Sequence, residues 1–95
     1  MEIVVIDLND EAPEEHEFVV SCREGNLAKV GEMLKKNADL VNFKEERHPH
    51  MTGLMAACCC GNLGVIELIS KHKHVDYDIE DAYGRNAANH ASKFF

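Results

Sequence analysis

The sequence predicts an all-α fold made of repeated helical hairpins. The first observation is the stretch Thr52–Ser70, TGLMAACCCGNLGVIELIS, in which a helix-favouring run, a turn glycine and a second apolar run follow one another. The second is that Gly25-Asn26-Leu27 recurs as Gly61-Asn62-Leu63, thirty-six residues later. Periods of this length are typical of repeat proteins. An aromatic content of 6% with no Trp also favours a helical array over a β-sandwich.

Residues 1–15 are predicted to form an acidic, partly ordered N-terminal arm. Seven acidic residues and no Lys or Arg lie in the first seventeen positions, and the remaining chain is formally neutral, with ten acids and ten bases. The run from Ile3 to Ile6 favours a strand, but Pro13 and nearby carboxylates discourage its continuation. The alternative is a segment that joins a partner's sheet or covers the end of the helical array. Neither part has the basic surface that nucleic-acid binding requires.

The first hairpin is predicted to begin near Glu17. Apolar residues recur at helical spacing on both sides of its glycine turn: Phe18, Val19, Cys22, Val30, Met33 and Leu34. In the middle copy, Thr52 is expected to cap the helix start and Gly61 to end that helix in a left-handed conformation. The second helix of this copy carries an apolar stripe that must be covered on more than one side.

A third copy is predicted to begin near Asp81. Asn86 lies thirty-four residues after Thr52, and the chain reaches Phe94-Phe95 where the second helix of this copy would be needed. We therefore expect about two and a half repeats in a domain of residues 16–95, with repeats at about 16–46, 47–80 and 81–95, the last one truncated.

The three copies together resemble the ankyrin repeat. The middle copy matches the ankyrin pattern at Thr52, Leu54, Ala57, Gly61, Val65 or Ile66, Leu68 and Ile69. The first copy matches it at Gly25, Leu27, Val30, Leu34, Asn37-Ala38-Asp39 and Val41-Asn42. The third copy matches it at Asp81, Gly84 and Ala91. Two departures are a Gly at position 53 and a Met at position 55, where the family has Pro and His. The loop Lys44–His50 is two residues longer than the pattern and has no glycine at His50, so a distorted or enlarged finger loop is expected there.

The cysteines and histidines are interpreted as structural or surface residues. Cys22 and Cys58 fall at equivalent small inward positions, and Cys59 and Cys60 at solvent-facing positions before the turn. Neighbouring positions on a helix diverge by about 100°, so these last two thiols are poorly placed to share one metal ion. No metal and no cofactor are predicted. The histidine pairs, His48 with His50 and His72 with His74, are expected in solvated turns; the alternatives are a weak metal site or a pH-sensitive loop.

No catalytic signature is found, and the chain is predicted not to be an enzyme. It lacks a phosphate-binding glycine loop, a nucleophile elbow and a dinucleotide fingerprint. No apolar run is long enough to span a bilayer, and the N-terminus does not resemble a secretory signal. Four cysteines, three of them consecutive, are unlike a secreted disulfide framework, so a cytoplasmic, intracellular location is expected.

The ankyrin resemblance implies a protein-binding module that uses a concave surface of finger loops and first helices. The positions carried over to that surface are Arg23, Glu24, Met51, Cys59, Cys60, Ala82, Tyr83, Arg85, Lys93 and Phe94. Tyr83 and Arg85 are the expected hot spots, because aromatic and Arg side chains dominate such interfaces. The predicted interior consists of Phe18, Cys22, Leu27, Val30, Leu34, Leu54, Ala57, Cys58, Leu63, Ile66, Leu68, Ile69 and Ala91.

Three roles remain open at this point. In the first, the chain is a small scaffold subunit whose uncapped C-terminal end docks in a larger assembly. In the second, it is an N-terminal fragment of a longer ankyrin-repeat protein such as a kinase, channel or scaffold. The third is a thiol- or metal-responsive regulator that uses Cys59, Cys60 and nearby histidines.

Overall fold

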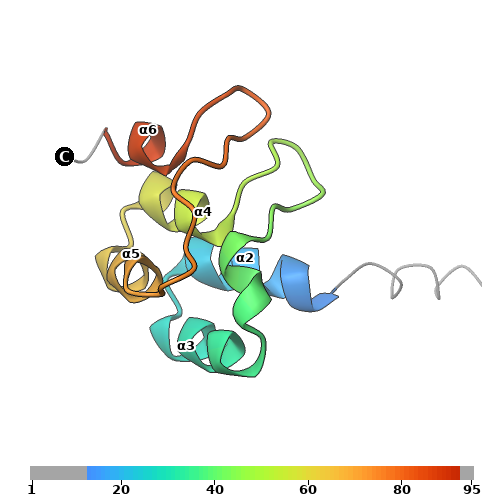
Figure 1. Ribbon diagram of the computed structural model, residues 1–95, viewed down its shortest axis with the longest axis vertical. Coiled ribbons are helices and arrows are strands. Elements are labelled where there is room, and N and C mark those ends of the chain that lie inside the picture. Colours follow the sequence, from blue (N-terminus) through green and yellow to red (C-terminus); the bar gives the residue numbers. More distant parts are fainter. Residues whose placement is uncertain (1–12, 93–95) are drawn as a thin grey trace, which may run out of the picture.

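A computed structural model of the chain describes residues 13–92, and this part is all-helical (Figure 1). Its elements are α2 (Pro13–Glu24), α3 (Leu27–Lys36), the 3-10 helix η2 (Ala38–Asn42), α4 (Gly53–Cys60), α5 (Leu63–Ser70) and α6 (Ala87–Ala91). Within residues 13–92 there is no strand, and one isolated bridge joins Lys44 to Thr52. No helix in this range is long and apolar enough to cross a membrane. The predicted all-α class is therefore confirmed for the described residues.

Helices α2 and α3 form the first hairpin. Helix α2 begins at Pro13, so the last three residues assigned to the arm are helical instead. Proline favours the first position of a helix, where no backbone donor is needed, and the acids that follow it complement the helix dipole. The helix ends at Gly25, which has a φ of 78°. The Asn26 amide then donates to the Ser21 carbonyl at 3.0 Å, which closes the turn.

The second hairpin, α4 and α5, repeats this local geometry. The Thr52 hydroxyl accepts from the Met55 amide at 3.2 Å, which confirms the predicted cap. Gly61 has the expected left-handed conformation, with a φ of 71°. The Asn62 amide donates to the Ala57 carbonyl at 2.9 Å, the bond equivalent to the one that closes the first turn.

Helix α6 is a short third start. The Asn86 side chain accepts from the Asn89 amide, and the Asn89 side chain accepts from the Asn86 amide, each at 3.0 Å. This reciprocal capping box stabilises a helix of five residues. The N-caps of α4 and α6 are residues 52 and 86, so the predicted spacing of thirty-four is present in the fold.

The hairpins stack side by side. Helix α4 packs between α2 and α6, and α3 packs against α5 (Figure 1). A Cβ added to Gly53 would lie 2.5 Å from Cε2 of Phe18 and 2.8 Å from Sγ of Cys22. The glycine that departs from the family pattern therefore allows α2 to approach α4 closely.

The core lies between these layers and agrees with most of the predicted interior. Eight predicted residues are buried: Phe18, Cys22, Val30, Leu34, Leu54, Ala57, Cys58 and Ile69. Three more, Ile66, Leu68 and Ala91, are partly buried and pack against the core. The prediction was wrong for Leu27 and Leu63, which are 47% and 59% exposed, because they begin the second helices at the edge of the stack. Buried apolar residues that were not predicted are Val19, Leu40, Val41, Met51, Met55, Ala56, Val65 and Ala87.

Asparagine side chains tie one hairpin to the next. Nδ2 of Asn62 donates to the carbonyls of Cys22 and Arg23 at 3.0 and 2.8 Å, and so satisfies the end of α2 from the following hairpin. Asn42 donates to the His74 carbonyl at 2.7 Å and accepts from the Asp76 amide at 2.8 Å. Each of these bonds joins an asparagine side chain to a backbone group more than thirty residues away, and together they fix the register of the stack.

Candidate protein-interaction surface

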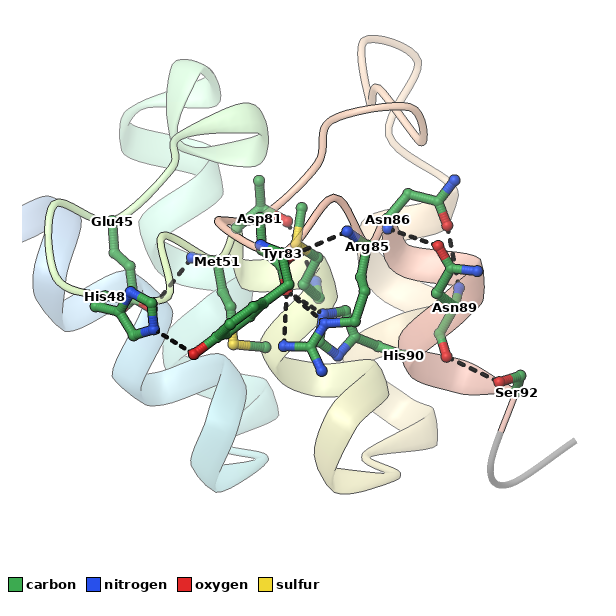
Figure 2. A network of polar contacts seen from close by, with 12 residues as sticks. Glu45, His48, Met51, Asp81, Tyr83, Arg85, Asn86, Asn89, His90 and Ser92 are labelled. Carbon is green, nitrogen blue, oxygen red and sulfur yellow. Dashed lines mark hydrogen bonds and ion pairs between the residues drawn. The ribbon is translucent and has the colours of Figure 1, made fainter.

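Two finger loops meet at their tips and form a continuous surface. We define the first finger as residues 44–52 and the second finger as residues 78–86. The Ala82 amide donates to the Pro49 carbonyl at 2.8 Å. Nε2 of His48 lies 2.7 Å from the hydroxyl of Tyr83, and the two rings meet edge to face at 5.1 Å (Figure 2).

The two fingers close differently. The closing bond of the first finger runs from the Glu45 amide to the Met51 carbonyl at 2.9 Å, across six positions. The second finger closes from Asp81 to Arg85 at 2.9 Å, across four positions. His50 has a φ of 65°, and Gly84, thirty-four positions later, has a φ of 75°. A non-glycine residue therefore occupies a left-handed position in the first finger, where its ring Nδ1 lies 3.1 Å from the Glu45 carbonyl.

Asp81 organises the second finger from inside. Its carboxylate is fully buried, and Oδ1 accepts from the amides of Tyr83 and Arg85 at 2.9 and 3.0 Å. Oδ2 accepts from Nε of Arg85 at 3.0 Å and from Nε2 of His90 at 2.9 Å, and it forms an ion pair with Nη2 of Arg85 at 3.0 Å. His90 must donate here, because an ionised carboxylate only accepts.

The hydrogen bonds to Asp81 outweigh its desolvation. Burial alone would raise the pKa of the carboxyl group, but the two backbone amides and the side chains of His90 and Arg85 together hold that pKa well below its usual range. The finger therefore contains a buried carboxylate that stays ionised at neutral pH. It fixes Arg85 on one side and α6, through His90, on the other (Figure 2).

Tyr83 and Arg85 stand at the surface above this carboxylate. Tyr83 is 64% exposed, and the Arg85 side chain is 47% exposed. Cζ of Arg85 lies 4.8 Å from the centroid of the Tyr83 ring, within cation–π range. The two predicted hot-spot residues are thus adjacent, exposed and held in one arrangement.

The remaining predicted surface residues are placed unevenly. Glu24, Cys60 and Ala82 are exposed, and Arg23 is half-buried, with Nη2 3.6 Å from a carboxylate oxygen of Glu45.

Two of these predictions need correction. Met51 was predicted at the surface but is only 6% exposed, because it lies at the base of the first finger, where its amide and carbonyl both bond to Glu45. Cys59, predicted to face solvent, is partly buried against the core. Lys93 and Phe94 lie outside the described residues.

The cysteines do not form disulfides or a metal cluster in the described range. Cys22 and Cys58 are buried as predicted, and Cys60 is exposed. Burial raises the pKa of the Cys22 thiol to about 12, with a small opposing effect of Arg23, and it also raises the pKa of Cys58. Across residues 13–92 no group of three or more His, Cys, Asp or Glu side chains is arranged to hold a metal ion.

The histidine pairs are close but serve local contacts. The rings of His48 and His50 are 6.1 Å apart, and those of His72 and His74 are 6.0 Å apart. Each residue of the first pair bonds to a finger group, and Nδ1 of His72 accepts from the His74 amide at 3.4 Å.

A groove runs between α3 and α5, away from the fingers. The side chain of Leu27 lies over Gly64, and that of Leu68 lies over Gly31, each with its nearest atom 3.6 Å from where a glycine Cβ would stand. This reciprocal packing of leucines on glycines accounts for the apolar character of the groove.

Three buried residues that hold the fingers in place, Asp81, His90 and Glu45, were not predicted from the sequence to do so. Asp81 was predicted only as a match to the ankyrin pattern. Its burial depends on the packing of the second finger against α6. His90 and Glu45 are also buried polar residues, and their local sequence carries no signal for it. A carboxylate at the first position of a short glycine turn, five residues before an Asn cap, is the pattern that would have pointed to Asp81.

Comparison of the chain with protein-family models, with curated proteins and with solved structures found no match in any of the three.

Proposed function

We propose that this chain is a non-catalytic protein-binding module of the ankyrin type, which binds a protein partner through the two fingers and the exposed side of the first helices. The observation that carries the proposal is the joined pair of finger tips, on which an exposed Tyr83 and Arg85 are held in place by a buried Asp81. Exposed aromatic and Arg side chains with fixed geometry are typical of interaction hot spots.

The ankyrin-type architecture is supported by equivalences at fixed spacing. Helix caps fall at residues 52 and 86, left-handed turn residues at 25 and 61 in the hairpins, and left-handed finger residues at 50 and 84. Each pair has the same local geometry. Within the described residues, successive hairpins pack in the order α2, α4, α6, with α4 in contact with both of the others, and this order is typical of a solenoid.

The polar groups near the fingers favour binding over catalysis. Asp81 and His90 form the closest acid–base pair of this surface, but both side chains are buried and used to hold the second finger and α6 together. A cytoplasmic, intracellular location belongs to the same proposal and is supported by two buried thiols and the lack of any disulfide among the four cysteines.

The proposal is tested by affinity enrichment with the full chain as bait. We expect a specific partner that is lost with the double variant Tyr83→Ala, Arg85→Ala and retained with Tyr77→Ala. Tyr77 is a suitable control because it is 49% exposed but lies outside the fingers, and its hydroxyl donates to the Ser70 carbonyl at 3.1 Å. A partner retained by both variants would place the binding surface elsewhere and contradict the proposal.

A further inference from the structure

Among residues 13–92, the contacts of the Arg85 guanidinium involve only one of its two hydrogen-bonding forks. A guanidinium presents five N–H donors, in a side-on fork of Nε and one Nη and an end-on fork of both Nη atoms. The side-on fork of Arg85 binds Asp81, with Nε and Nη2 each 3.0 Å from Oδ2. The end-on fork therefore points away from Asp81, on a side chain that is 47% exposed.

The position of this fork is fixed before any ligand binds. Asp81 holds one edge of the guanidinium, and the face of the Tyr83 ring lies 4.8 Å from Cζ. The Tyr83 ring is in turn held by His48 of the first finger. A long side chain normally loses rotamer freedom on binding, and here much of that loss has already occurred on folding.

The charge that a ligand meets at this point is positive. The Asp81 carboxylate is fully buried and satisfied by five donor contacts, so solvent meets the guanidinium and not the acid beneath it. Across the two fingers the exposed bases are Lys44, Arg47 and Arg85, and the exposed acids are Glu46, Asp78 and Glu80. The two fingers are therefore formally neutral, with three exposed bases and three exposed acids, whereas the whole chain has a net charge of −7.

We propose that the end-on fork of Arg85, supported by the Tyr83 ring, binds a carboxylate side chain on an acidic segment of the partner protein. Planar guanidinium and carboxylate groups match in a bidentate, charge-assisted pair, and such pairs are short and directional. The inference rests on the proposed protein-binding function and adds to it the chemistry of the partner's contact residue.

The test is an NMR titration of the ¹⁵N-labelled full chain with a blocked tetraglutamate peptide. Matched arms use a blocked tetraglutamine peptide and inorganic phosphate. We expect saturable shifts of the Tyr83 and Arg85 amides with tetraglutamate alone. Arg85→Lys keeps the charge but removes the fork and should weaken binding about tenfold. The charge-conserving control Lys35→Arg, at an exposed site on α3 outside both fingers, should leave binding within about twofold.

A second variant keeps the test valid if Arg85→Lys disturbs the finger. Tyr83→Ala removes an exposed ring and should weaken tetraglutamate binding by about two- to fivefold, the value of a surface cation–π contact. Equal affinity of wild type and Arg85→Lys, shifts that never saturate, or equal shifts with tetraglutamine would each overturn the inference. Equal binding of phosphate would show a general anion site and overturn the commitment to a carboxylate.

Failure of this inference can be told apart from failure of the proposed function. If enrichment recovers a partner that the double variant loses, but tetraglutamate does not bind, the module stands and the carboxylate contact is wrong. If tetraglutamate binds at Arg85 but no partner depends on the fingers, the proposed function is wrong.

Discussion

Replacing Asp81 by Asn should destabilise the protein through the second finger and α6. The substitution keeps the shape of the side chain and one carbonyl oxygen, which can still accept from the amides of Tyr83 and Arg85. The second oxygen becomes an NH₂ group that faces Nε and Nη2 of Arg85 and Nε2 of His90. Three donor contacts to an ionised acceptor are therefore lost.

The size of the loss follows from the exposure of the partners. A hydrogen bond to a charged group contributes about 1.5–3 kcal/mol when buried. The bond to the buried His90 should contribute in this range. The hydrogen bond and the ion pair from the half-exposed Arg85 should contribute much less, because Arg85 can turn to water. We expect a total loss of about 2–3 kcal/mol in the free energy of unfolding. With a urea dependence of about 1 kcal/mol per M, the midpoint should fall by about 2–3 M.

The same variant has a defined pH signature. The native pKa of Asp81 lies below the unfolded value of about 3.9, so the ionised carboxylate stabilises the folded state above that pH. This contribution is lost as the pH falls through the native pKa. The stability difference between wild type and Asp81→Asn should therefore be constant from pH 7 to about 5 and shrink below about pH 4.

The assay is urea unfolding followed by far-ultraviolet circular dichroism, at pH 7 and at steps down to pH 3. Asp78→Asn is the control, since Asp78 is an exposed residue at the edge of the same finger. A loss below about 0.5 kcal/mol, or an equal loss in Asp78→Asn, would refute the argument that Asp81 organises the finger.

Three further predictions concern packing, register and thiols. Gly53→Ala should lower the free energy of unfolding by about 1–3 kcal/mol, measured by thermal or urea unfolding. Gly64→Ala is the control: its added Cβ would lie 3.6 Å from the nearest atom, so this variant should be neutral or slightly stabilised. The reverse order of stabilities would contradict the close approach of α2 and α4. Asn62→Ala should lower the free energy of unfolding by about 1–2 kcal/mol in the same assay, because two carbonyls at the end of α2 lose the Asn62 side chain as their donor. An unchanged unfolding midpoint would show that water replaces this donor. When the native protein is labelled with iodoacetamide at pH 8 and followed by mass spectrometry, Cys60 should react first and Cys22 only after unfolding. The reason is that burial raises the pKa of the Cys22 thiol to about 12. Rapid modification of Cys22 would show that the core opens readily.

The helices could be predicted from the sequence because their ends carry local signals. Thr52, Gly25 and Gly61 act through their own backbone or a neighbour three residues away, so the pattern alone identifies them. Leu27 and Leu63 were misplaced because apolar character does not reveal which side of a helix faces the stack. These two residues begin α3 and α5, where they lie at the edge of the stack.

The candidate surface could be predicted only in part. Tyr83 and Arg85 were found from their position in a repeat and their residue type. The buried support beneath them, Asp81 with His90, depends on contacts across nine residues and on the packing of α6. Met51 was wrongly predicted at the surface, because the first finger closes through bonds between Met51 and Glu45, and the Met51 side chain is buried in the core.

The central claim is that a protein partner binds at the joined finger tips. The most direct measurement is photocrosslinking from a benzophenone amino acid placed at position 83, with the same group at position 77 as the matched exposed control. The account predicts one crosslinked partner from position 83, displaced by unlabelled wild-type chain, and none from position 77. Equal crosslinking from both positions, or capture of the partner from position 77 alone, would contradict it.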